Sequence, residues 1–221
     1  MVGLVVVGSS VVRWLGLRIE KRDFSILRQI YRFRFCLGRH IKALCDFTGA
    51  RACDRRLKLL IEAGYLERQK VLYGIPSLYY LTKQGKQLLG VSLYQDKNNI
   101  SRIPHNIGVL DAVCYFKEKY GLALDDIKSE KELHSIDGFG VRKHKPDFVI
   151  TYQNENIAVE IELTLKAKRR FEENVKSNFL NYDKQIWIVP RNETRITSLL
   201  TNWQASYDNI EILLCEEVIN N

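Results

Sequence analysis

The sequence has few of the residues that mark zinc-binding or disulfide-linked proteins. Its five cysteines are Cys36, Cys45, Cys53, Cys114 and Cys215. No two of them form a CxxC pair, and zinc sites need Cys or His residues clustered at short spacing. We therefore expect neither a structural zinc site nor a disulfide framework, and we expect the thiols to be reduced.

Signals for disorder and for a membrane span are also weak. Only four of the 221 residues are proline and 46% are hydrophobic, a composition typical of folded chains. The apolar run 2–12 is too short to cross a membrane, and no basic residue follows Met1 as in a secretory signal. We expect this run to be a buried strand or the product of an upstream start codon. The expected location is the cytoplasm, with no membrane partner.

Positive charge is concentrated in the first part of the chain. Residues 1–90 contain 17 Lys or Arg and 6 Asp or Glu, whereas residues 91–221 contain 17 and 20. The two parts therefore carry net charges of +11 and −3. A basic module followed by a mildly acidic one is typical of a DNA-binding part joined to a part that gathers carboxylates.

The periodicity of the basic part predicts three helices, a hairpin and a last helix. Apolar residues including Phe24 recur at helical spacing after Asp23, a good N-cap. The expected elements are helices at 23–35, 38–45 and 50–63, strands at 65–72 and 78–81, and a helix at 82–89. Gly64 and Gly90 would end two of these helices. This order predicts a winged helix-turn-helix over 21–90, after an apolar segment 1–20.

Basic side chains fall where a winged helix meets duplex DNA. The third helix presents Arg51, Arg55, Arg56 and Lys58, and the hairpin adds Arg68 and Lys70. Side chains near the start of a recognition helix reach base edges, and basic residues on the wing contact phosphates. We therefore expect double-stranded DNA as the partner. The alternative is a winged helix that contacts protein.

A second domain is expected over 104–221, after a polar linker at 91–103. Its predicted elements are helices at 104–120, 166–180 and 194–204, and strands at 146–152, 157–164, 185–190 and 210–214. Ser129 and Glu132 form a capping-box pattern, and 137–140 is a Gly-rich loop. The whole chain is thus expected to have an α/β (α+β) fold.

Three carboxylates are expected to meet in this second domain. Side chains alternate faces along a strand, so Glu160 and Glu162 share one face. Asp147 begins the neighbouring strand and could lie across from Glu160. Carboxylates that converge at a strand end suit Mg²⁺ or Mn²⁺. The alternative is a pair of glutamates that face solvent.

Pro146-Asp147 followed by Glu160-Ile161-Glu162 resembles the motif of the PD-(D/E)xK phosphodiesterases. The resemblance implies a restriction-endonuclease-like mixed-sheet domain, in which Asp147, Glu160 and the carbonyl of Ile161 bind the metal. Glu162 stands where the motif has lysine and would act on the attacking water. Lys166 or Lys168 would then supply the missing cation, and Glu130 would match an additional acidic residue of some members.

A longer resemblance spans residues 23–190. Arg56-Leu57, Ala63-Gly64-Tyr65-Leu66, Leu81-Thr82, Pro104-His105 and Glu160-Ile161-Glu162-Leu163-Thr164 resemble the replication-relaxation family. That family is similar to MobC-type plasmid relaxases, which implies a DNA-nicking enzyme acting at an origin of transfer or replication. Because the motif lysine is absent, a non-catalytic DNA-binding regulator with a degenerate nuclease domain is the alternative.

Three further residues bear on the mechanism. His105, at a helix start, is expected to have a structural role, because helix N-termini disfavour protonated histidine. Tyr152 and Tyr182 are the tyrosines nearest the carboxylates, and they represent the rival route of tyrosine attack. A two-fold dimer is compatible with a winged helix, although no heptad pattern indicates one.

Overall fold

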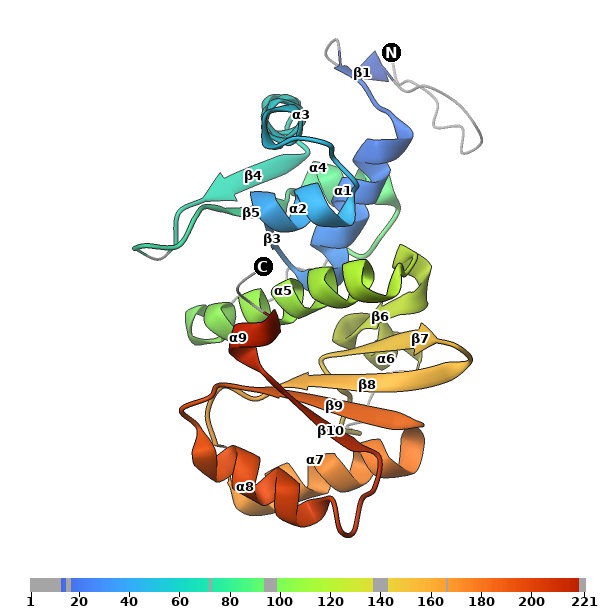
Figure 1. The fold of residues 1–221 in the computed structure, drawn as a ribbon. Helices are drawn as coiled ribbons and strands as arrows, with labels where there is room; N and C mark the ends of the chain where they lie inside the picture. Colours follow the sequence, from blue (N-terminus) through green and yellow to red (C-terminus); the bar gives the residue numbers. More distant parts are fainter. Residues whose placement is uncertain are drawn as a thin grey trace. The chain divides into compact units, whose positions relative to one another are not determined.

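The computed structural model describes residues 13–14, 17–71, 73–93, 99–136, 143–165 and 167–218. The apolar run 2–12 and the loop 137–140 expected from the sequence lie outside these ranges. The chain forms two compact units, Met1–Lys97 and Asn98–Asn221 (Figure 1). Each unit combines helices with a β-sheet of its own, so the fold is of the mixed α+β class.

The first unit is built on helices that match the expected positions closely. They are α1 (Lys21–Phe33), α2 (Gly38–Leu44), α3 (Ala50–Glu62) and α4 (Lys83–Leu89). Gly64 adopts a φ of +78° after α3, and the Tyr65 amide donates to the Leu60 carbonyl, a Schellman ending. The Thr82 side chain accepts a hydrogen bond from the Gly85 amide and so caps α4.

Two expectations about α1 were wrong. Glu20, rather than Asp23, is the N-cap residue, and its amide donates to the Asp23 carboxylate. Phe24 is 40% exposed instead of buried, while Asp23 is fully buried. The helix therefore faces inward through Ile26, Leu27 and Ile30, which are fully buried. The charged Asp23 can be buried because it has a cationic partner on α3.

The strands of the first unit form a three-stranded antiparallel sheet in the order β3-β5-β4. The hairpin strands β4 (Leu66–Gln69) and β5 (Leu78–Leu81) lie within the expected ranges. The third strand, β3 (Cys36–Leu37), was not expected. A separate two-stranded ribbon pairs β1 (Arg13–Trp14) with β2 (Leu17–Arg18).

The second unit contains a five-stranded mixed sheet in the order β10-β9-β8-β7-β6. Its strands are β6 (Ile127–Ser129), β7 (Phe148–Tyr152), β8 (Glu155–Ile161), β9 (Lys184–Val189) and β10 (Ile210–Leu214). Strand β7 is antiparallel to both β6 and β8, whereas β9 is parallel to both β8 and β10. β6 was not expected, and β8 ends at Ile161, three residues before the expected end.

Helices cover both faces of this sheet (Figure 1). They are α5 (Ile103–Tyr120), α6 (Glu130–Ile136), α7 (Lys168–Asn181), α8 (Thr194–Trp203) and α9 (Cys215–Val218), with short 3-10 turns η1 (Ile100–Arg102) and η2 (Leu124–Asp126). On one face, Phe171 of α7 packs edge-on against Trp187 of β9, in a core shared with α8. On the other face, Phe116 of α5 packs on Phe148 of β7. Ser129 and Glu132 form the expected capping box at the start of α6.

Candidate functional site

The α3 helix presents a basic surface on the side away from the core. Cys53, Leu57 and Leu60 are buried on its inner side. Arg51, Arg55 and Lys58, all expected from the sequence to contact DNA, are exposed on the outer side. The Lys58 ammonium lies 3.8 Å from the Glu62 carboxylate, and both of these side chains are mostly exposed. An exposed pair of this kind is weak and can be exchanged for another anion.

Arg56 differs from these neighbours because its guanidinium is used inside the protein. It forms an ion pair with the Asp23 carboxylate of α1 and donates to the Arg18 carbonyl oxygen at 2.9 Å. Only 16% of the Arg56 side chain is exposed. This geometry assigns Arg56 to holding α3 against α1, and its expected contact with DNA stays a prediction.

The hairpin carries the other two basic residues that the sequence singles out. Arg68 and Lys70 are both exposed, on β4 and just after it. The Arg68 guanidinium lies 6.0 Å from the centre of the Tyr79 ring, so the neighbouring strand β5 steadies it. Tyr73, in the turn between the strands, is 99% exposed.

The second unit has a pocket of about 370 Å³ where β7 begins and β8 ends. The β7–β8 register pairs Phe148 with Val159 and, continued by one residue, places Asp147 opposite Glu160. Both carboxylates line the pocket together with Ile161 and Glu162. Of the expected site residues, Asp147, Glu160, Ile161, Glu162 and Glu130 therefore lie around one cavity.

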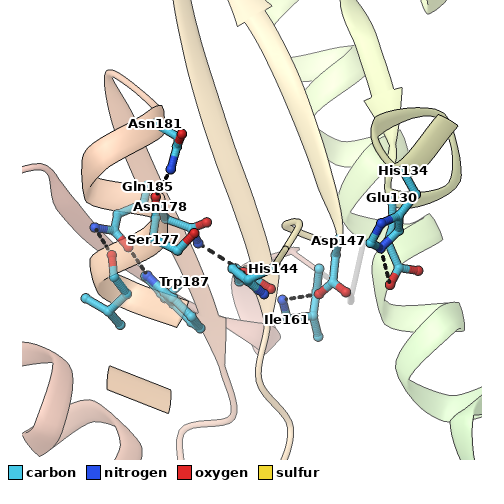
Figure 2. Close-up of polar contacts among 12 residues, drawn as sticks. Glu130, His134, His144, Asp147, Ile161, Ser177, Asn178, Asn181, Gln185 and Trp187 are labelled. Atoms are coloured by element: carbon cyan, nitrogen blue, oxygen red, sulfur yellow. Dashed lines mark hydrogen bonds and ion pairs between the residues drawn. The ribbon is translucent and has the colours of Figure 1, made fainter. Parts of the chain in front are cut away.

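Asp147 is held by three elements. Its Oδ2 accepts a hydrogen bond of 2.8 Å from the Ile161 amide of β8, and its Oδ1 lies 3.0 Å from Nε2 of His105 on α5. Its backbone carbonyl accepts from the Glu130 amide at the start of α6. Figure 2 shows Asp147 and Ile161 between His144 and Glu130. His105 is thus a pocket residue, which its position at a helix start did not indicate.

Glu160 is almost completely buried and has two partners. Its Oε1 lies 2.7 Å from His144 Nε2 and accepts a 3.0 Å hydrogen bond from Asn178 Nδ2 of α7. Burial raises the pKa of Glu160, and the nearby Asp147 charge adds to this, while His144 and Asn178 oppose it. His144 and Asn178 were not anticipated, because the first lies in a basic stretch and the second on a helix.

The structure describes one of the two lysines that were expected to replace the missing motif lysine. Lys166 lies outside the described residues. Lys168 is exposed at the start of α7 and is not among the residues that line the pocket. The pocket is instead lined by three other cationic side chains, Arg102, Lys145 and Arg170.

The expected metal ligands Asp147 and Glu160 are each paired with a histidine. No group of three His, Cys, Asp or Glu side chains within the described ranges is placed so that it could hold a metal ion. Asp147 and Glu160 turn oxygens toward His105 and His144 instead. A buried oxygen beside Glu160, Asn178 Oδ1, has no hydrogen-bond partner among the described atoms, but one such oxygen is not a set of ligands.

Carboxylate–imidazole pairs are the chemistry that the pocket offers most directly. A histidine held by a carboxylate has a fixed orientation and can accept or donate a proton near neutral pH. The two tyrosines considered from the sequence lie elsewhere. Tyr152 is five residues along the strand direction from Asp147, roughly 16 Å, and it stacks on Tyr120. The Tyr182 carbonyl accepts from Asn209, and neither tyrosine lines the pocket.

Comparison with protein-family models gives a match. A family model described as "Replication-relaxation" matches residues 27–178, about two thirds of the chain. That range includes the second half of α1, all of α2, α3 and α4, Asp147, Glu160 and most of α7. No curated protein matches the sequence. In the part of the chain that the structure describes, no helix is long and apolar enough to span a membrane.

Proposed function

Since the chain belongs to the replication-relaxation family, which suggests a role in the replication or mobilisation of a plasmid or another mobile element, we propose that it binds double-stranded DNA through its first unit. In this proposal the unit is a winged helix-turn-helix, α3 is the recognition helix and the β4–β5 hairpin is the wing. The natural target would be an origin of replication or of transfer.

The observation that carries this proposal is the outer surface of α3. Arg51, Arg55 and Lys58 project from one helix and have no buried partner among the described residues, while Arg56 fixes that helix on α1. A helix that is anchored in this way presents its basic residues as a rigid set. Arg68 and Lys70 on the hairpin would add contacts to the DNA backbone.

Duplex binding is tested by fluorescence anisotropy over a range of salt concentrations. The Arg51→Ala/Arg55→Ala variant should bind at least tenfold more weakly, with a salt slope reduced by about 0.9 for each phosphate that is no longer neutralised. Arg28→Ala, which removes an exposed charge from α1 instead, is the control and should bind almost as well as the unmodified protein. Equal losses in the two variants would mean that α3 is not the contact surface.

A second candidate function is cleavage of DNA at the pocket of the second unit. The observation that favours it is that Asp147, Glu160 and Glu162, the residues of the PD-(D/E)xK-like pattern, line one cavity with cationic side chains. This is the relaxase-like activity that similarity to MobC-type proteins would imply. The proposed cofactor is Mg²⁺ or Mn²⁺, and its binding would require Asp147 and Glu160 to exchange their histidine partners for the ion.

Relaxation of a supercoiled plasmid that carries the cognate origin tests the second candidate. An enzyme should relax the plasmid with Mg²⁺ or Mn²⁺, lose this activity in EDTA, and lose it in Glu162→Gln without losing duplex binding. Tight duplex binding with no relaxation in either metal would instead identify a non-catalytic DNA-binding regulator. Protein covalently attached to the cut strand would show tyrosine attack and rule out this pocket as the centre.

A further inference from the structure

The pocket of the second unit is lined by cationic side chains that the sequence pattern does not include. Arg102 comes from η1, Lys145 from the segment before β7, and Arg170 from the first turn of α7. Three elements that are distant in the sequence therefore bring positive charge to one cavity. The same lining also holds four carboxylates: Glu130, Asp147, Glu160 and Glu162.

The two arginines do not pair with those carboxylates. Arg102 and Arg170 are exposed, and neither has an ion pair or side-chain hydrogen bond with another described residue. Asp147 is already bonded to His105 and to the Ile161 amide, and Glu160 to His144 and Asn178. The guanidinium groups are therefore available to an anion from outside, and guanidinium binds phosphate through paired hydrogen bonds.

The start of α7 adds a further feature that favours an anion. The helix has 14 residues, no side-chain cap at Ala167 and no acidic residue in its first turn. Arg170 and Asn174, one turn apart on the same face, both line the pocket. The helix dipole there favours an anion and acts together with the two arginines.

We propose that Arg102 and Arg170, with Lys145, bind a backbone phosphate of a single DNA strand at the mouth of this pocket. The carboxylates repel a phosphate from the deeper part, so the phosphate lies between the arginines and the strand passes over the acidic residues. A cavity of about 370 Å³ in one unit suits a single strand, which exposes individual nucleotides, better than a duplex. This inference deepens the cleavage proposed for the same pocket and is independent of α3.

Anisotropy with a labelled 12-nucleotide oligothymidylate tests this proposal in the full chain. All variants carry Arg51→Ala/Arg55→Ala, so that α3 contributes little to the signal. Adding Arg102→Ala/Arg170→Ala should weaken binding at least tenfold and reduce the salt slope by about 0.7 for each phosphate that is no longer neutralised. Arg102→Lys/Arg170→Lys, which keeps the charge and removes the paired hydrogen bonds, should give an intermediate affinity.

Arg169→Ala is the matched control. Arg169 adjoins Arg170 on α7 but is 92% exposed, pairs with Glu173 and does not line the pocket. Its replacement should change the affinity less than twofold. Equal losses in the Arg102/Arg170 and Arg169 variants would overturn the proposal. So would inorganic phosphate that competes as well as the oligonucleotide does per phosphate, because the pocket would then be a simple anion site.

The duplex, oligothymidylate and plasmid assays together distinguish strand binding at the pocket from the two proposed functions. Failure of duplex binding through α3 appears in the duplex assay, with the oligothymidylate affinity unchanged. A strand-binding pocket without cleavage appears as loss of oligothymidylate affinity in Arg102→Ala/Arg170→Ala in a protein that does not relax plasmid.

Discussion

The Arg56 guanidinium of α3 is paired with the Asp23 carboxylate of α1, a side chain with no exposed surface. The same guanidinium donates to the Arg18 carbonyl, and hydrogen bonding to Asp23 raises the pKa of Arg56. One side chain thus connects β2, α1 and α3. The outer surface of α3, which we propose contacts DNA, is therefore held in place by Arg56, whose guanidinium faces the buried Asp23.

The first prediction concerns the stability that this pair provides. Arg56→Ala leaves the Asp23 carboxylate buried without its cation, so unfolding should become easier by on the order of 3 kcal/mol. Urea denaturation followed by circular dichroism measures this change. The adjacent Arg55→Ala removes an exposed charge and should change stability by less than about 0.5 kcal/mol. Similar midpoints for the two variants would contradict the structural role of Arg56.

A second prediction concerns Gly85 in α4, which packs directly against the backbone of the segment that precedes β4. A Cβ atom at this position would overlap the Tyr65 carbonyl oxygen and crowd Leu81. Gly85→Ala should therefore lower the stability of the first unit by about 1–3 kcal/mol. Gly49→Ala is the control, because a Cβ atom there meets no other atom within 4 Å. Urea midpoints that order the two variants the other way would show that α4 does not approach Tyr65 so closely.

The third prediction is a pH dependence caused by Glu160. Its pKa is raised in the folded protein, chiefly by burial, so the stability it contributes is fully present below its unfolded pKa. That contribution is lost as the pH rises through the folded value. Glu160→Gln removes this loss, so the stability of the unmodified protein relative to this variant should fall from pH 4 to pH 8. Paired urea titrations across that range measure the difference, and a constant or rising difference would be contrary to the prediction.

The fourth prediction concerns the thiols. None of the five cysteines is in a disulfide, and burial raises the pKa of both Cys53 and Cys215 to about 11. At pH 8 these two thiols are almost entirely protonated and are shielded, so they should resist alkylation. Cys114 is partly exposed and should react first. Mass spectrometry after timed iodoacetamide treatment gives the order, with urea-unfolded protein as the control in which all sites react.

The sequence predicts the elements of this fold best where a local signal marks an end. Gly64 and Gly90 adopt positive φ values at the ends of the helices that they were expected to stop. The strands β3 and β6 have two and three residues, too few for an alternating pattern to appear. Helix α7 begins two residues after its expected start, and Arg170 rather than Lys168 lines the pocket.

The candidate site was predictable only as far as local spacing reaches. Asp147 and Glu160 could be paired because a short hairpin joins their strands. The partners of these carboxylates could not be found in the same way, because His105 is 42 residues from Asp147 and His144 is 16 from Glu160. Neither sequence separation corresponds to a helical or strand period, so only the tertiary fold brings these groups together.

The hydrogen bonds of Asp147 should limit local opening of the pocket. One residue is tied through its side chain to α5 and β8, and through its carbonyl to α6. Opening the pocket at this point would break contacts to three elements at once, so small local fluctuations should not expose it. The amides of Ile161 and Glu130 should then exchange with deuterium only when the second unit unfolds as a whole. A ligand would therefore meet a cavity that is already shaped, and binding there would require little rearrangement of the backbone.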